Sequence, residues 1–466
     1  MVEFFDQIYS SKYDYAEMKK IKLPYGYLLI IHALIALAVF VLPFLSKIYA
    51  LLIPIVGFYI VYVTKNKNNE VLLIAAYMVG VEVFLRMTGG NFNNEFIKVN
   101  VIFFMLFGMI YSNFSINAFV YCFFLILLIP GILVTSFYAD FNMDIRKTLV
   151  FNLSGPVCLA ISAIYMFKRK ILFADLQEIV VAMGLPIITT AVYLFLYNPS
   201  VKDVVTGTQS NFETSGGFGP NQVSTALGLG MFIFFTQLIL FSKSKKRMIL
   251  NGILLLFISY RAIVTFSRGG VITAVIMIVC LLFLLYCFSN AKGKKKFSLV
   301  FILTALMAGG IWTYSSLQTS GLINKRYANQ DAAGRAKKDR LGGREEIMDS
   351  EFKLFLDNPI LGVGAGMGKK IRKVDLGFEV ASHNEIFRML SEHGLFGIFG
   401  LLLLFITPLI LYINNRQHLY FLSFYVFWLL TINHAAMRTA APAFVYALAL
   451  LSVEVKNLKR TENSQD

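Results

Sequence analysis

The chain has 466 residues, of which 57% are hydrophobic and only 15% are charged. About a quarter of the residues of a soluble globular protein are charged, and apolar runs close to the ~20 residues that cross a bilayer recur along the whole chain. Composition therefore excludes a soluble protein and indicates an all-α polytopic membrane protein. The net charge of +16 does not point to nucleic acid, because the basic residues lie in short clusters between apolar runs, as topogenic signals do.

The hydrophobic pattern predicts roughly 14 transmembrane helices. In chain order, the predicted spans are 26–46, 48–64, 71–87, 97–112, 116–137, 147–167, 177–197, 221–242, 248–267, 269–289, 297–316, 394–413, 419–435 and 441–455. With the N-terminus inside, basic clusters such as "KSKKR" (243–247) and "KGKKK" (292–296) fall in the cytoplasm, as the positive-inside rule requires. Both termini are then predicted to be cytoplasmic.

This topology divides the chain into five predicted regions. They are a cytoplasmic segment (1–25), the first eleven spans (26–316), a large outer loop (317–393), three more spans (394–455) and a cytoplasmic tail (456–466). The large loop is far more polar than the rest of the chain, and a hydrophilic loop of this length is usually functional or disordered. Helix signals within it favour an ordered loop.

One of these helix signals is "GGREEIMDSEFKLFLDNP" (342–359). Two glycines precede it, acidic residues occupy its first turn and a proline ends it, so we expect a helix that starts at Arg344. Met348, Phe352 and Phe355 are predicted to line one face of this helix.

A second signal is "SHNEIFRMLSEHGLFG" (382–397), which holds two of the five histidines. Ser382 and Glu385 fit a capping box, which makes His383 the first helical residue and leaves His393 in the last turn before a glycine. The helix dipole disfavours an imidazolium at His383 and favours one at His393. A neutral His383 can act as a general base, although this stretch alone also fits a surface residue at a helix start.

Two arginines are predicted to project to the same side of the membrane as His383. Arg268, in "FSRGG" (266–270), falls at an outer turn, and Arg344 opens the loop helix. Two guanidinium groups beside a neutral imidazole suit a diphosphate leaving group and a nucleophile that must lose a proton. The alternative for Arg268 is an interfacial arginine that reaches lipid headgroups, and the basic segment 325–344 fits a solvated loop as well as an anion-attracting surface.

Other unusual residues have structural interpretations. The glycine-rich stretch 358–368 matches neither a dinucleotide-binding nor a phosphate-binding loop, so we interpret it as tight backbone packing. Glu82 and Arg86 lie four residues apart on one helix face. Arg261 is roughly 10 Å deeper than Arg268 on its helix, at a depth similar to that of Glu82, and we predict a structural ion pair between Arg261 and Glu82.

Five motifs in this order resemble those of the bacterial O-antigen ligase and polymerase superfamily. They are "GGFGPNQVSTALGLG" (216–230), "SRGG", "GGREE", "NPILGVGAG" and "SHNEIFRMLSEHGLFG", and together they cover roughly residues 210–400. The resemblance implies a membrane glycosyltransferase of the GT-C type that needs neither a metal nor another cofactor. It also implies a donor glycan on polyprenyl (undecaprenyl) diphosphate and places the large loop in the periplasm.

The resemblance also assigns roles to residues of this chain. It implies that Arg268 and Arg344 bind the donor diphosphate and that His383 activates the acceptor hydroxyl. Candidate supporting residues are Arg261, Glu82, Asn384 and Asn221. An acidic residue sometimes invoked near the last spans has no clear equivalent in this chain.

Several functions fit these motifs. The favoured hypothesis is an O-antigen ligase of the bacterial inner membrane that attaches the glycan to lipid A-core. An O-antigen or exopolysaccharide polymerase and a protein O-oligosaccharyltransferase of the same superfamily are alternatives. A lipid-linked glycan flippase is an alternative of another class, but it should carry charges in both halves of the chain and show repeat symmetry. Membrane lipids and the two glycan substrates are the expected partners, and the sequence gives no oligomeric state.

Overall fold

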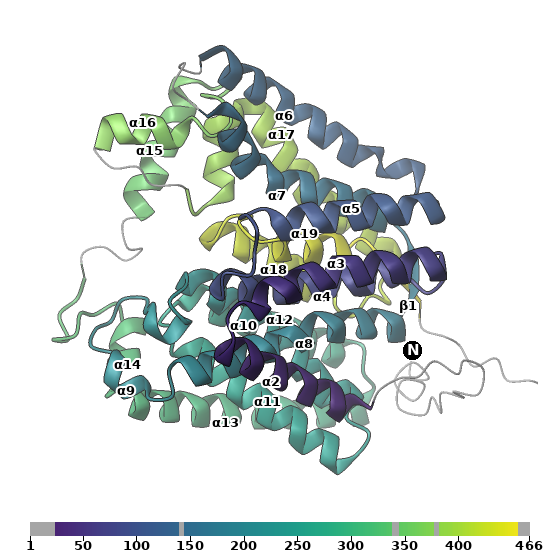
Figure 1. Ribbon diagram of the computed structural model, residues 1–466, viewed down its shortest axis with the longest axis vertical. Helices are drawn as coiled ribbons and strands as arrows, with labels where there is room; N and C mark the ends of the chain where they lie inside the picture. Colours follow the sequence, from purple (N-terminus) through teal and green to yellow (C-terminus); the bar gives the residue numbers. More distant parts are fainter. Residues whose placement is uncertain (1–23, 139–143, 338–343, 377–381, 455–466) are drawn as a thin grey trace, which may run out of the picture.

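The computed structural model describes residues 24–138, 144–337, 344–376 and 382–454, and 77% of the structure is helical (Figure 1). The helices in chain order are α2 (Tyr25–Val41), α3 (Leu45–Thr64), α4 (Glu70–Met87), α5 (Phe96–Tyr111), α6 (Phe119–Tyr138), α7 (Ile145–Met166), α8 (Phe173–Tyr197), α9 (Val201–Val204), α10 (Pro220–Thr236), α11 (Lys245–Ile263), α12 (Arg268–Cys287), α13 (Ala291–Gln318), α14 (Leu322–Tyr327), α15 (Arg344–Asp357), α16 (Gly368–Leu376), α17 (Glu385–Asn414), α18 (Phe421–His434) and α19 (Ala441–Leu448). Two short strands, β1 (Lys170–Leu172) and β2 (Ser452–Glu454), pair in parallel.

Each predicted span overlaps one of these helices. Within the described residues, eight helical segments are long and apolar enough to cross a membrane, and three more apolar helices are shorter. A stretch of apolar residues this long has no stable place in water, and a helix satisfies all of its own backbone hydrogen bonds in lipid. The chain is therefore a multi-pass membrane protein, while the total of 14 crossings stays a prediction.

The last predicted span, 441–455, is longer than the helix that the structure shows in this region. Helix α19 has eight residues, which corresponds to about 12 Å, whereas the hydrocarbon core of a bilayer is about 30 Å thick. After α19 the chain turns and forms β2, where Ser452 lies opposite Lys170 of β1. Every residue of α19 is buried, so its apolar sequence reflects burial within the protein rather than contact with lipid.

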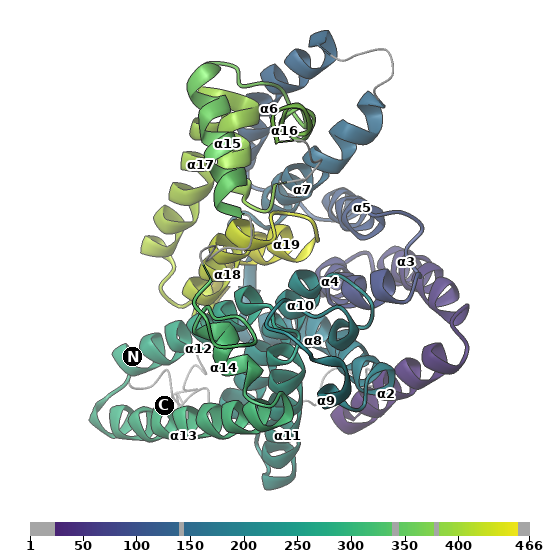
Figure 2. The same cartoon turned by 90° about the vertical axis from the view of Figure 1, so that its left-hand side faces the viewer.

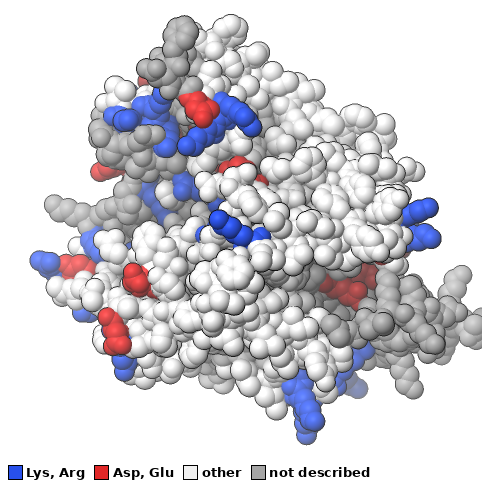
Figure 3. Space-filling model, viewed as in Figure 1, with Lys and Arg blue, Asp and Glu red and all other residues white. Residues whose placement is uncertain are grey.

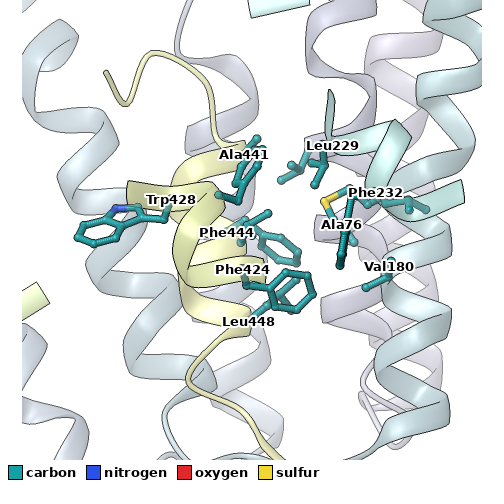
Figure 4. Close-up of a cluster of buried hydrophobic side chains, with 14 of the residues drawn as sticks. Ala76, Val180, Leu229, Phe232, Phe424, Trp428, Ala441, Phe444 and Leu448 are labelled. Carbon is teal, nitrogen blue, oxygen red and sulfur yellow. The ribbon is translucent and has the colours of Figure 1, made fainter. Parts of the chain in front are cut away.

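The core lies where α4, α8, α10, α18 and α19 meet. Figure 4 shows Phe232 and Leu229 of α10 facing Phe444 and Phe424 of the last two helices, and these side chains are all buried. In Figure 2, α18 and α19 lie between a group that contains α6, α7 and α17 and a group that contains α8, α11 and α13. Helix α13 lies at the outside, with only 6% of its spanning window buried.

The short helices of the large loop all lie at one end of the bundle, with α14 apart from α15 and α16. Helices α14, α15 and α16 are at the left in Figure 1, as is α9, and β1 is at the opposite end. In Figure 3 most of the visible surface is uncharged, and lysines and arginines gather toward the left-hand end. The charge distribution thus agrees with an apolar belt in the bilayer and a basic surface at the end that carries the loop helices.

Helix α15 confirms the helix predicted at 342–359, but not its buried face. The helix packs on α17 through Ile347, Glu351 and Leu354, whereas Phe352 is 45% exposed. The prediction followed the aromatic residues, and it failed because a buried glutamate occupies the centre of the true packing face.

The orientation in the membrane gives a first testable prediction. We expect a cysteine at the exposed Ala333, in the large loop, to react with an impermeant maleimide in intact spheroplasts, and a cysteine at the exposed Lys294 to be protected. The native Cys287 is exposed and should first be replaced by alanine. Protection of Ala333→Cys together with labelling of Lys294→Cys would place the loop in the cytoplasm and would contradict the topology.

Candidate functional site

Arg268 is the first residue of α12, and α10 and α18 pack closely against the two glycines that follow it. A Cβ atom on Gly270 would lie 2.1 Å from the carbonyl oxygen of Ser224 in α10, and one on Gly269 would lie 2.4 Å from the ring of His434 in α18. Only glycine permits such approaches. The sequence "RGG" therefore holds Arg268 at the loop end of the bundle, close to α10 and α18.

A second arginine, Arg326 of α14, lies beside this turn. It donates hydrogen bonds to the Phe266 carbonyl oxygen (3.0 Å) and to the Ser210 hydroxyl (3.3 Å). Burial lowers the pKa of Arg326, and the nearby cations Arg268 and Arg344 lower it further. Three guanidinium groups thus lie near one another. Arg326 was not predicted as a site residue, because its place in a basic segment was its only signal.

Arg344 begins α15, as predicted, and is half-buried. Burial lowers its pKa, and the charge of Arg268 adds to this effect. A cation is unfavourable at the positive end of a helix, and two further guanidinium groups nearby make the position less favourable still. We refer to Arg268, Arg326 and Arg344 as the arginine cluster, and its physical character is that of a site for a multiply charged anion.

His383 does not begin a helix, because the predicted capping box does not form. The N-cap of α17 is Asn384, whose side-chain oxygen accepts hydrogen bonds from the N–H groups of Ile386 and Phe387. The Ser382 hydroxyl instead accepts from the Asn384 N–H at 3.1 Å. The capping residue is thus two positions later than predicted, since asparagine caps a helix as well as serine does. His383 lies just before the N-cap and is half-buried, so it still faces the positive end of the helix dipole.

The connection between α18 and α19 holds the His383 segment from the other side. The Ala436 N–H donates to the His383 carbonyl oxygen (3.1 Å), and Arg438 donates to the Ser382 carbonyl oxygen (2.8 Å). Burial lowers the pKa of Arg438, and Arg344 is among the cations that lower it further. This connection begins directly after His434, the last residue of α18, whose ring lies against Gly269 beside Arg268. His383 and the arginine cluster therefore lie next to the same α18–α19 connection.

Two of the predicted supporting residues, Asn221 and Asn384, form hydrogen bonds with the segments that carry Arg268 and His383. Asn221 of α10 accepts a hydrogen bond from the Ser267 hydroxyl at 2.8 Å, directly before Arg268. Asn384 caps α17, and its amide group also donates to the Asn433 side chain of α18 at 3.1 Å. Both asparagines therefore fix backbone that carries a site residue.

The predicted ion pair between Glu82 and Arg261 is wrong. Glu82 forms its ion pair with Arg86, at 2.6 Å on the same helix. Arg261 donates to backbone carbonyl oxygens near the C-terminal end of α8, at Leu194 and Asn198; the Leu194 carbonyl oxygen also accepts from the Asn198 N–H at 3.1 Å. Equal depth in two helices says nothing about which helices are neighbours, and this is why the prediction failed.

His393 is not the capping cation that the sequence suggested. It is buried, 1% exposed, and a Cβ atom on Gly131 of α6 would lie 2.4 Å from its Nδ1 atom. Gly394 does leave the helical conformation, with φ 58° and ψ −136°, but α17 continues beyond this kink. The glycine marks a bend rather than an end, because apolar residues that can extend the helix follow it.

The glycine-rich stretch 358–368 serves backbone packing, as predicted. The Val363 N–H donates to the Ser391 carbonyl oxygen of α17, and the Ala365 N–H donates to the Gly131 carbonyl oxygen of α6. Gly364, with φ 97°, packs so closely on α6 that a Cβ atom would lie 2.7 Å from the Thr135 hydroxyl. This stretch therefore fastens the base of the large loop to two membrane helices.

A cluster of buried charges beside His383 was not predicted. Arg372 of α16 pairs with Glu351 of α15 at 3.0 Å, and Arg388 of α17 pairs with Glu385 and, at 3.3 Å, with Glu392. A cavity of about 200 Å³ lies among several of these side chains and is also bordered by Arg438. The sequence did contain a signal for part of this cluster, because Glu385 and Glu392 lie three and four residues from Arg388 on one helix.

The fold and this site define a class of protein: a multi-pass membrane protein with a cationic, partly enclosed site at the loop end of its helices. Residues 253–402 match the family model described as O-antigen ligase. The match supports the resemblance to the O-antigen ligase and polymerase superfamily over this stretch. No curated protein matches the chain significantly.

The matched stretch contains the three principal site residues, Arg268, Arg344 and His383. Members of the family are glycosyltransferase-like enzymes, and the family in general uses lipid-linked glycans and glycan acceptors. Asn221 and Glu82 lie outside the match.

Proposed function

We propose that this protein moves a glycan from polyprenyl diphosphate to an acceptor hydroxyl at the periplasmic face of the bacterial inner membrane. The observation that carries this proposal is the arginine cluster at the loop end, bordering the same α18–α19 connection as His383. Arg268 and Arg344 bind the diphosphate, and Arg326, whose own hydrogen bonds hold α14 on the turn, adds positive charge.

In the proposed reaction, the acceptor oxygen attacks the anomeric carbon of the donor glycan. The bond from that carbon to the diphosphate oxygen breaks, and polyprenyl diphosphate leaves with the electron pair while the arginines stabilise its charge. His383 takes the proton of the acceptor hydroxyl. No step is assigned to a metal, and we expect a chelator to leave transfer unchanged.

An apolar groove supports a lipid-linked donor. The groove, of about 810 Å³, lies between α10, α11, α12 and α13, and Trp312 and Tyr327 are among its lining residues. Tyr327 contacts Trp312 edge to face, with 4.7 Å between ring centres, and it adjoins Arg326 of the arginine cluster. A polyprenyl chain in this groove would bring its diphosphate to the cationic end.

The groove gives a second testable prediction. Gly252 of α11 lines it, and a side chain at this position meets nothing within 4 Å. We expect Gly252→Leu to fold well, since leucine favours a helix by about 0.8–1 kcal/mol over glycine. Because the new side chain fills the groove, KM should rise several-fold for a long-chain donor and little for a short-chain one.

A matched control for this substitution is Gly310→Leu. Gly310, on α13, is exposed and also has open space around it, but it is not among the groove-lining residues. Equal KM values of the two variants for the long-chain donor would show that the chain lies elsewhere.

We propose lipid A-core as the acceptor, which makes the protein an O-antigen ligase. The test is a transfer assay with purified protein, a polyprenyl-diphosphate-linked glycan and vesicles that contain either lipid A-core or a second lipid-linked repeat. A ligase puts label on lipid A-core. Label found only on the second repeat would make the protein a polymerase instead.

A further inference from the structure

A buried carboxylate, Glu351, links the loop helix α15 to the segment that carries His383. Its side chain is 1% exposed, and its Oε2 atom accepts a hydrogen bond from the Ser382 hydroxyl at 3.0 Å. Its other oxygen accepts from Arg372 of α16 at 3.0 Å. Burial of a carboxylate is costly unless it is paired, so both contacts stabilise one orientation of Glu351.

Ser382 connects Glu351 to the backbone around His383. Its hydroxyl accepts from the Asn384 N–H at 3.1 Å, and its carbonyl oxygen accepts from Arg438 at 2.8 Å. The segment 382–384 is therefore fixed by α15, by the start of α17 and by the α18–α19 connection. Helix α15 also begins with Arg344, so one helix carries both a diphosphate contact and the support of the base.

We propose that Glu351 is a positioning residue, which acts through Ser382 to hold His383 in reach of the acceptor hydroxyl. This inference rests on the proposed function, since it takes His383 to be the base. A general base must lie about 2.6–3.2 Å from the oxygen whose proton it removes, and a displacement of about 1 Å can cost up to 100-fold in rate. A link that fixes the His383 backbone therefore affects turnover more than donor binding.

The charge of Glu351 makes this support depend on pH. Burial raises the pKa of the Glu351 carboxyl group to about 7, against the opposing effects of Arg372, the Ser382 hydrogen bond and Arg388; Glu392 raises it further. These groups come from both helices that pack on α15. Above pH 7 Glu351 is ionised and pairs with Arg372. Below that pH it becomes protonated and the ion pair is lost.

The first test compares turnover of Glu351→Gln with that of the natural protein across pH. Glutamine resembles the protonated carboxyl group and still fits the site. We expect Glu351→Gln to have a kcat several-fold lower than the natural protein at pH 8, and the two values to converge below pH 6. A ratio that stays the same at every pH would mean that Glu351 is only structural, which contradicts the proposal.

The second test breaks the link without disturbing the pair of Glu351 with Arg372. Ser382→Ala should lower kcat on the order of tenfold with little change in the KM of the donor. Ser391→Ala is the matched control, because Ser391 is also buried but lies within α17, and its hydroxyl donates to the Arg388 carbonyl oxygen of the same helix. Equal kcat values for the two alanine variants would overturn the proposal.

A double variant separates this inference from the proposed function. In a His383→Ala background, Ser382→Ala should cause no further loss, because residues that act through one another are not additive. A full additional tenfold loss would mean that Ser382 acts independently of His383. If His383→Ala alone has normal transfer, the proposed function fails instead, whatever the behaviour of Ser382→Ala and Glu351→Gln.

Discussion

Replacing His383 with alanine is expected to lower the transfer rate on the order of 100-fold or more, which is the usual contribution of a general base. The fold should survive, because hydrogen bonds of the backbone and of neighbouring side chains hold this segment. The Ala436 N–H binds the His383 backbone carbonyl oxygen, and Asn384 supplies the cap of α17. The measurement is glycan transfer per folded molecule, with folding followed by thermal unfolding in detergent.

His393→Ala provides the contrast within the same motif. His393 is buried against α6, so its removal should destabilise the protein by about 0.5–3 kcal/mol, as core substitutions commonly do. Transfer per folded molecule should stay near normal. Normal transfer by folded His383→Ala, or a larger catalytic loss in His393→Ala, would remove His383 from the mechanism.

The second large effect is expected from Arg268→Lys and Arg344→Lys. Lysine keeps the charge but loses the planar fork that binds two phosphate oxygens at once. A lost charge-assisted hydrogen bond is worth about 1.5–3 kcal/mol, so each variant should have a kcat/KM lower by roughly 10- to 100-fold. Competition by free polyprenyl diphosphate should weaken in parallel, which separates a binding role from a folding defect.

Arg335→Lys is the matched control for these two variants. Arg335 belongs to the same large loop, is 82% exposed and pairs with Asp331 at 2.8 Å. Exposed ion pairs contribute at most about 1 kcal/mol to stability, so transfer should not change. Full activity of both Arg268→Lys and Arg344→Lys would show that the arginine cluster does not bind the diphosphate.

The sequence predicted the membrane helices well because each lies in a long apolar run, and lipid leaves such a run few other conformations. The prediction of membrane spans failed where apolar residues are buried within the protein, because their sequence looks the same as that of residues that face lipid. Helix α19 has an apolar sequence, yet it is a short helix enclosed by its neighbours. Tertiary packing determines whether an apolar helix lies in the protein interior or in lipid, and the periodicity of a sequence does not distinguish the two.

The residues of the candidate site could be predicted only where local sequence features point to them. Arg268, Arg344 and His383 stood out because the sequence places each at a helix start, where local rules for charge and capping apply; Arg268 and Arg344 do begin helices, whereas His383 lies just before the N-cap. The contacts of Arg261 with the end of α8, and the contact between Glu351 and Ser382, join segments that are distant in sequence or separated by a loop. Such pairings depend on which helices are neighbours, and a single sequence does not specify this.

The central claim, transfer from a polyprenyl diphosphate, is tested most directly by the products of purified protein in vesicles. The donor would carry one label on the glycan and another on the lipid, and lipid A-core would be the acceptor. We predict one molecule of polyprenyl diphosphate released for each glycan joined to lipid A-core, and almost none with His383→Ala. Movement of the doubly labelled donor across the bilayer with no release of polyprenyl diphosphate would contradict the account and would favour a flippase.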